Sequence, residues 1–179
     1  MPLSQLEVGL LETVESLRDD AVRLVQYLVR IPSITGEETK AQLFFAELLH
    51  DLKLNVDSYF PTRAELQTHP SFSDDGLPLG ERPIVIGHLP GKDTAARSLI
   101  LNGHMDVVPV GDENLWTDGA WSGVVRDGKI FGRGSCDMKG GLVSGLIAIS
   151  ALLKSDYHPA GSVWIQSVIG EESSGAGTL

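Results

Sequence analysis

The stretch LILNGHMD, residues 99–106, decides the fold class of this chain. Its first residues are apolar and predict a buried β-strand, which delivers His104 and Asp106 at its end. The run SVWIQSVI, residues 162–169, predicts a second such strand and leads directly into Gly170-Glu171-Glu172. Strands with apolar residues on both faces are typical of a sheet that is covered by helices.

Helical segments alternate with these strands. Residues 3–29 carry apolar side chains at helical spacing and predict one long helix or two short ones. Thr35 followed by Glu38 is typical of a helix start, with Thr35 capping a helix that runs to about residue 52. Residues 142–154 are almost free of polar side chains and predict a helix buried on most sides. The alternation indicates an α/β fold with a central, mostly parallel or mixed sheet flanked by helices.

Two clusters of turn residues predict hairpins. Pro90-Gly91-Lys92-Asp93 lies between short apolar runs at residues 83–89 and 98–102, and we expect it to join them as a hairpin turn. Asp127-Gly128 predicts a tight turn between two β segments within residues 124–131.

Composition and charge exclude several classes of function. The chain has 179 residues, enough for one domain with a hydrophobic core, and no apolar run reaches the roughly 20 residues that span a membrane. The formal net charge of −10 argues against nucleic acid as a partner. Cys136 is the single cysteine, so no intrachain disulfide can form. The N-terminal stretch is acidic, unlike a signal peptide, and we expect a cytoplasmic protein.

The histidine and the aspartate after the first strand form the first polar cluster. Two-residue spacing in an extended chain places His104 and Asp106 on one face. A carboxylate beside an imidazole can hold one ring nitrogen and present the other to a metal or a proton. The alternative is an ordinary surface His and Asp near a turn.

A glycine-rich loop and a pair of acids form the second and third clusters. Residues 132–141 place Asp137 among glycines at the start of the apolar helix, as a metal ligand or merely as the helix cap. A phosphate loop is a rival, but its Gly-x4-Gly-Lys-Ser/Thr pattern is absent. Glu171 and Glu172 end a buried strand, which is costly unless a metal or proton compensates them. The alternative for this pair is a solvated acidic turn.

Together the three clusters provide one imidazole and several carboxylates at strand ends, where open α/β sheets bind ligands. This donor set is typical of a divalent metal: zinc, or else cobalt or manganese. A nucleotide-binding domain is a minor alternative, because no Gly-x-Gly-x-x-Gly fingerprint opens a helix.

The motifs HMDVVP (residues 104–109), GRGSCDMKGG (residues 132–141) and Glu171-Glu172 occur in an order that resembles a known family. It is the co-catalytic zinc family of acetylornithine deacetylase, succinyl-diaminopimelate desuccinylase, aminoacylase and glutamate carboxypeptidase. The resemblance covers essentially the whole chain, including VRIPS at residues 29–33. It implies a zinc-exopeptidase-like catalytic domain.

The resemblance also implies a role for each residue. His104 would bind one metal ion, Glu172 the second, and Asp137 would bridge both. Asp106 would hold His104 through its other ring nitrogen. Glu171 would be the general base that takes a proton from a metal-bridging water and passes it to the leaving amine. The cofactors would be two divalent ions, Zn²⁺ in first place and Co²⁺ as the alternative.

Two further ligands and a dimerisation domain of that family have no counterpart in residues 1–179. We therefore expect this chain to be the N-terminal part of a single, truncated catalytic domain, inactive alone, whose full-length form is a homodimer. The substrate would be a small N-acyl amino acid or related amine, cleaved at a linear amide. A di- or tripeptide exopeptidase is the alternative within the family. An inactive fragment, or a binding or structural protein, is the alternative of another class.

Overall fold

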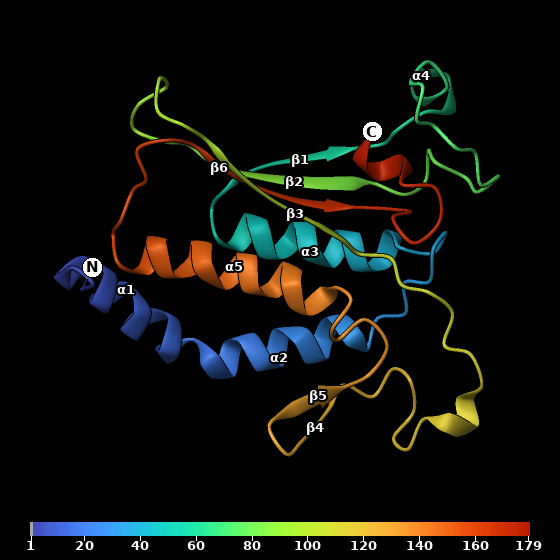
Figure 1. Ribbon diagram of the computed structural model, residues 1–179, viewed down its shortest axis with the longest axis horizontal. Helices are drawn as coiled ribbons and strands as arrows, with labels where there is room; N and C mark the ends of the chain where they lie inside the picture. The colour runs from blue at the N-terminus through green and yellow to red at the C-terminus, as the bar shows by residue number, and fades with distance from the viewer. Residues whose placement is uncertain (1) are drawn as a thin grey trace.

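A computed structural model describes residues 2–179 and has a four-stranded mixed sheet at its centre (Figure 1). The strand order is β1-β2-β6-β3, with β1 at Asn55–Tyr59, β2 at Ile84–Leu89, β3 at Leu99–His104 and β6 at Val163–Val168. The β1–β2 and β2–β6 pairs are antiparallel, and β3 runs parallel to β6. The predicted mixed sheet flanked by helices is confirmed, and its parallel pair is the one that ends in the polar clusters.

The four longer helices all lie on one face of the sheet (Figure 1). They are α1 (Gln5–Ser16), α2 (Arg18–Val29), α3 (Thr39–Asp51) and α5 (Lys139–Lys154). Helices α3 and α5 pack on the strands, and α1 and α2 pack behind α5. The amphipathic segment 3–29 is therefore two helices, which meet at the buried Leu17.

The hydrophobic core fills the space between the sheet and α3 and α5. Val85 of β2 and Ile165 of β6 are almost fully buried, as are Phe45 of α3 and Leu146 of α5. Gly87 allows α3 to approach, because a Cβ atom there would lie 2.9 Å from a Leu49 methyl carbon. Burial of these side chains provides the main free energy that holds the sheet against the helices.

The predicted hairpin between β2 and β3 is wrong, because β6 lies between the two strands. The segment after β2 instead contacts the segment before β6: the Lys92 and Asp93 N–H groups donate to the Pro159 and Ala160 carbonyls at 3.1 and 2.9 Å. A turn signal specifies a local reversal, and it does not say which strand each neighbour finally pairs with.

Shorter elements complete the chain. The hairpin at Asp127-Gly128 is confirmed, because both residues have positive φ (51° and 71°), as the turn requires. It joins β4 (Val124–Arg126) to β5 (Lys129–Phe131). The helix α4 (Arg63–Leu66) interrupts an otherwise irregular segment, and two 3₁₀ turns occupy Glu113–Leu115 and Ala176–Thr178. Within residues 2–179, every helix is too short or too polar to cross a membrane.

Candidate metal centre

His104 ends β3 with its imidazole buried and its two ring nitrogens in different environments. Nδ1 lies 2.9 Å from the backbone carbonyl oxygen of Asp106. A carbonyl can only accept, so Nδ1 carries a proton, and Nε2 is the ring nitrogen that is left to face the carboxylates or a metal ion. Nε2 faces Asp137 Oδ1 at 3.1 Å and Glu171 Oε2 at 3.7 Å. The histidine is thus held in the tautomer that can bind a metal ion through Nε2.

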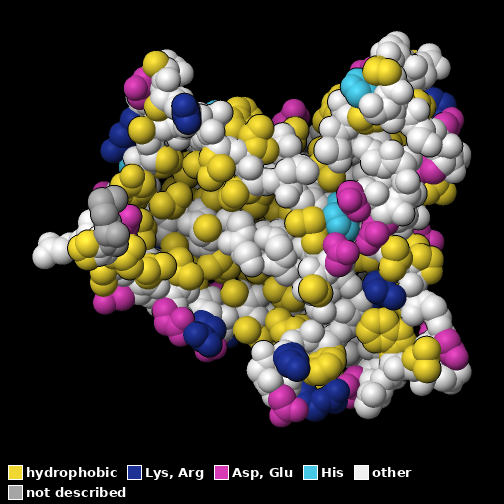
Figure 2. All heavy atoms as spheres, viewed as in Figure 1, with side chains coloured by type: hydrophobic (Ala, Val, Ile, Leu, Met, Phe, Trp, Pro, Cys, Tyr) yellow, Lys and Arg dark blue, Asp and Glu magenta, His cyan; other side chains and the backbone are white. Residues whose placement is uncertain are grey.

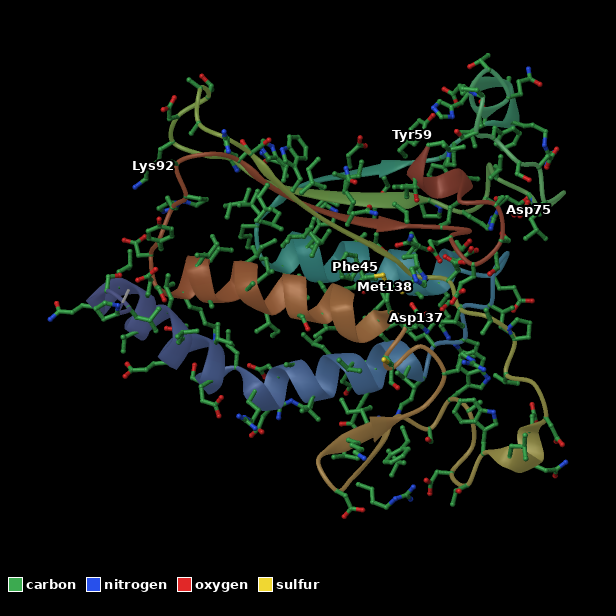
Figure 3. All side chains as sticks on the ribbon, in the orientation of Figure 1. Phe45, Tyr59, Asp75, Lys92, Asp137 and Met138 are labelled. Carbon is green, nitrogen blue, oxygen red and sulfur yellow. The ribbon has the colours of Figure 1, made fainter. Side chains whose placement is uncertain are left out.

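Asp137 comes from the glycine-rich loop that precedes α5. Gly134 has φ +83° and packs so closely that a Cβ atom there would lie 2.7 Å from Val107 Cγ1. The helix begins at Lys139, and its cap residue is Met138 rather than Asp137, so the reading of Asp137 as the helix cap is wrong. Figure 3 shows Asp137 and Met138 at the start of α5, on the side of the molecule where β3 and β6 end.

The two glutamates follow β6 on a tight turn. Gly170 has φ +66°, a left-handed conformation that a glycine adopts without strain. Ligand atoms of His104, Glu171 and Glu172 all lie within 4.8 Å of one another, which is close enough for one metal ion to contact them. In Figure 2 acidic side chains gather around a histidine in a recess between two projecting lobes.

Asp106 is fully buried, and its carboxylate has a different partner from the expected one. The backbone carbonyl, not the carboxylate, orients the imidazole, because the carboxylate oxygen lies 3.7 Å from His104 Nδ1. The carboxylate instead accepts the Glu171 and Glu172 backbone N–H groups at 3.1 and 3.0 Å. It also accepts the Thr35 hydroxyl at 3.0 Å, so Thr35 is not the helix cap that its sequence context predicted.

The electrostatics of the site favour a bound cation. Burial raises the pKa of Glu172, and the neighbouring Asp137 carboxylate raises it further. Burial lowers the pKa of His104, but the Asp106 carbonyl and the surrounding carboxylates raise it by more. Carboxylates packed this closely repel one another unless a positive charge lies between them. The imidazole and carboxylate donors fit a divalent ion such as zinc.

The structure places all five candidate residues at one site: His104, Asp106, Asp137, Glu171 and Glu172. The group that a single ion could contact consists of His104, Glu171 and Glu172, whereas Asp137 is near this group only through His104 Nε2. Sequence reasoning missed the buried Glu38, Arg82 and Lys139 that surround them. Their types gave no signal, because a charged residue in an amphipathic segment or a loop is ordinarily exposed.

Comparison with known proteins agrees with the resemblance predicted from the motifs. Residues 100–179 match peptidase family M20/M25/M40. The chain is 31% identical to the N-formyl-4-amino-5-aminomethyl-2-methylpyrimidine deformylase of Bacillus subtilis, over 99% of this chain and 38% of that protein. It is 39% identical to the succinyl-diaminopimelate desuccinylase of Methylorubrum extorquens, over 75% of this chain and 30% of that protein. The chain therefore spans about a third of the length of these curated relatives.

Solved structures share the fold. Human carnosine dipeptidase 1 superposes with a TM-score of 0.73 at 21% identity, over 89% of this chain and 33% of that chain. The dipeptidase Dug1p of Saccharomyces cerevisiae superposes with a TM-score of 0.74 at 20% identity, over 94% of this chain and 35% of that chain. At this identity the likeness establishes the fold alone, a mixed sheet with helices packed on it, and leaves the substrate open.

Proposed function

We propose that this chain is the N-terminal part of the catalytic domain of a metal-dependent hydrolase. The match of residues 100–179 to peptidase family M20/M25/M40 is the basis of this proposal. The whole protein would cleave the linear amide of a small N-acyl amino acid or related amine. The convergence of His104, Glu171 and Glu172 within 4.8 Å carries the proposal. The names of the desuccinylase and deformylase relatives support a deacylase in particular.

His104, Asp137 and Glu172 would hold two divalent ions, most simply zinc, with Asp137 shared between them. When bound, such ions polarise an amide carbonyl and make a neighbouring water more acidic. Catalytic zinc sites usually have three protein ligands. This chain offers each ion two, so we infer that further ligands come from the rest of a longer protein.

Glu171 would move the proton in this reaction. Its side chain is about half exposed, and Oε2 lies 3.7 Å from His104 Nε2, beside the proposed ion site. A carboxylate there can take a proton from water and deliver it to the leaving nitrogen. Asp106 would serve both halves of the site, because its carbonyl orients His104 and its carboxylate holds the backbone of Glu171 and Glu172.

The second candidate function is a di- or tripeptide exopeptidase, which the shared fold with two dipeptidases supports. A cytoplasmic location and a homodimer of the full-length protein stay predictions. An inactive fragment, or a binding or structural protein, is the outcome if no metal binds.

Zinc binding by the chain tests the site itself. Because this chain offers each ion only two ligands, we expect it to bind zinc weakly, measured by titration at equilibrium, and to lose most of that binding in His104→Ala. The matched control is His50→Ala, whose side chain is exposed at the end of α3 and lies outside the cluster. Equal zinc binding in wild type and His104→Ala would contradict the assignment of the site.

Turnover by a full-length protein that contains this chain tests the reaction. We expect hydrolysis of N-succinyl, N-formyl or N-acetyl amines in preference to dipeptides, and loss of turnover with retained zinc in Glu171→Gln. Preference for dipeptides would select the exopeptidase alternative. Unchanged turnover in Glu171→Gln would remove the proton-transfer role.

A further inference from the structure

The turn that carries Glu171 and Glu172 is held by two buried carboxylates. The Gly170 N–H donates to Glu38 Oε1 at 3.2 Å. The next two N–H groups, those of Glu171 and Glu172, donate to Asp106 Oδ1 and Oδ2 at 3.1 and 3.0 Å. Three consecutive N–H groups are therefore fixed by charged acceptors, which bind backbone donors more strongly than neutral ones do.

Glu38 comes from a part of the chain far from the metal-site motifs. It immediately precedes α3 and is 0% exposed. Its Oε2 accepts the Gly36 N–H at 3.1 Å, so its carboxylate joins the loop before α3 to the turn after β6. Every partner of Glu38 is an N–H donor, an environment that favours the ionised carboxylate, although burial raises its pKa.

Arg82 supplies the compensating charge. Its guanidinium is 1% exposed, and Nη1 donates to both Glu38 oxygens at 3.0 and 3.3 Å. Its Nε donates to the Pro78 carbonyl, and its Nη2 is buried without a partner among residues 2–179. A buried ion pair of this kind contributes little net stability compared with apolar side chains of similar volume, so stability alone gives no reason for it here.

A second residue near the start of α3 also hydrogen-bonds to the end of β6. Gln42, one helical turn after Glu38, is buried and donates through Nε2 to the Ser167 and Val168 carbonyls at 2.9 and 3.2 Å. Glu38 and Gln42 therefore hold successive backbone groups from the last residues of β6 into the turn. The start of α3 is thus hydrogen-bonded to three backbone groups at the end of β6 and in the turn that follows.

We propose that Glu38, charge-balanced by Arg82, is a positioning residue that fixes the turn at Gly170 so that Glu171 and Glu172 face His104. The role of the two glutamates toward a metal ion rests on the proposed function. The hydrogen bonds that fix the turn do not depend on that function. Asp106 fixes the turn from the β3 side, and Glu38 fixes it from the α3 side.

The double variant Glu38→Met/Arg82→Met tests this inference. It removes both charges and keeps similar side-chain volumes, so the fold is expected to persist. Backbone amide hydrogen exchange, measured by NMR on the metal-free chain, is expected to be about tenfold or more faster at Gly170, with core strand amides unchanged. Zinc affinity, measured by titration, is expected to fall about 10- to 100-fold, as when a group that orients a ligand is lost.

Two further variants make the result specific. Glu37→Met changes the exposed neighbour of Glu38 and is expected to leave both Gly170 exchange and zinc affinity as in wild type. Glu38→Gln keeps the side-chain shape and one carbonyl acceptor, so its zinc affinity is expected to fall less than in the double variant, and it replaces that variant if the latter does not fold.

The two readouts separate this inference from the proposed function. Gly170 exchange and zinc affinity equal to wild type in a folded double variant would overturn the positioning role. Faster exchange at Gly170 in a chain that never binds zinc would support the hold on the turn and count against the proposed metal site.

Discussion

At the scale of single residues, Asp106 orients two parts of the site, one through its backbone carbonyl and the other through its carboxylate. Its carbonyl accepts from His104, and its carboxylate accepts from Thr35 and from the backbone of Glu171 and Glu172. The orientation of the imidazole and the orientation of the acids therefore depend on the same residue. A residue that does not contact the candidate metal ion can therefore still affect the affinity for that ion.

Asp106→Asn is expected to weaken both the fold and the site. The amide group would turn one acceptor into a donor that faces an N–H group or a hydroxyl, at a cost of about 1 to 3 kcal/mol in the free energy of unfolding. Urea unfolding of the metal-free chain measures this loss, and zinc titration should show weaker binding. Asp57→Asn, on an exposed position of β1, is the matched control. Equal unfolding free energies for the two variants would contradict this account.

At the scale of elements, the junction of α2 and α5 places the loop that carries Asp137. Lys139, the first residue of α5, is 0% exposed, and its Nζ donates to the Leu28 and Ile31 carbonyls at 2.9 and 2.8 Å. Leu28 lies in the last turn of α2, and Ile31 follows the end of that helix. The lysine thus ties the start of one helix to the end of another, and burial lowers its pKa to about 8.

The stability of the metal-free chain is expected to rise between pH 8 and 10.5 through Lys139. Its folded pKa of about 8 lies below the ordinary 10.5, so within this window the unfolded chain binds more protons. Unfolding free energy then increases with pH, by up to about 3 kcal/mol over the window, and this contribution is absent below pH 8.

Urea unfolding at several pH values in the presence of a chelator measures the slope. Lys139→Met should remove this rise, whereas Lys154→Met, at the exposed far end of α5, should keep it. The same slope in Lys139→Met as in wild type would show that the buried lysine is not its source.

At the scale of the whole molecule, the sheet ends in an open edge. Strand β3 is the last in the order, and within residues 2–179 nothing pairs with its outer side. Leu99 and Ile100 are 53% and 56% exposed there, and Figure 2 shows hydrophobic side chains spread over this face. An unpaired edge with apolar side chains is a template for association between copies of the chain.

Ile100→Lys is expected to reduce self-association of the chain. A charge on the edge strand opposes pairing between copies, while the unfolding free energy should change by no more than about 0.5 kcal/mol at so exposed a position. Light scattering over a concentration series measures the effect. Leu115→Lys is the control, because Leu115 is 82% exposed in a 3₁₀ turn away from the sheet edge. An equal reduction in the control would mean that added charge, and not the β3 edge, is responsible.

The sequence alone determined the features that depend on neighbouring residues. The turn at Asp127-Gly128 needs positive φ, which these residue types allow, so it could be predicted locally. His104 and the pair Glu171-Glu172 could be identified because they lie at or just after the ends of buried strands. An unpartnered polar side chain at such a point would cost free energy of folding. Type and spacing therefore identified the candidate clusters, and the roles of their residues stay predictions.

Only the tertiary structure decided which distant segments meet. It placed β6 between β2 and β3, so a turn signal at residues 90–93 did not become a hairpin. It directed Thr35 to Asp106 instead of a helix start, and paired Glu38 with Arg82 across 44 positions of sequence. Partners of this kind are chosen by burial and charge compensation in the folded chain, and no local pattern encodes them.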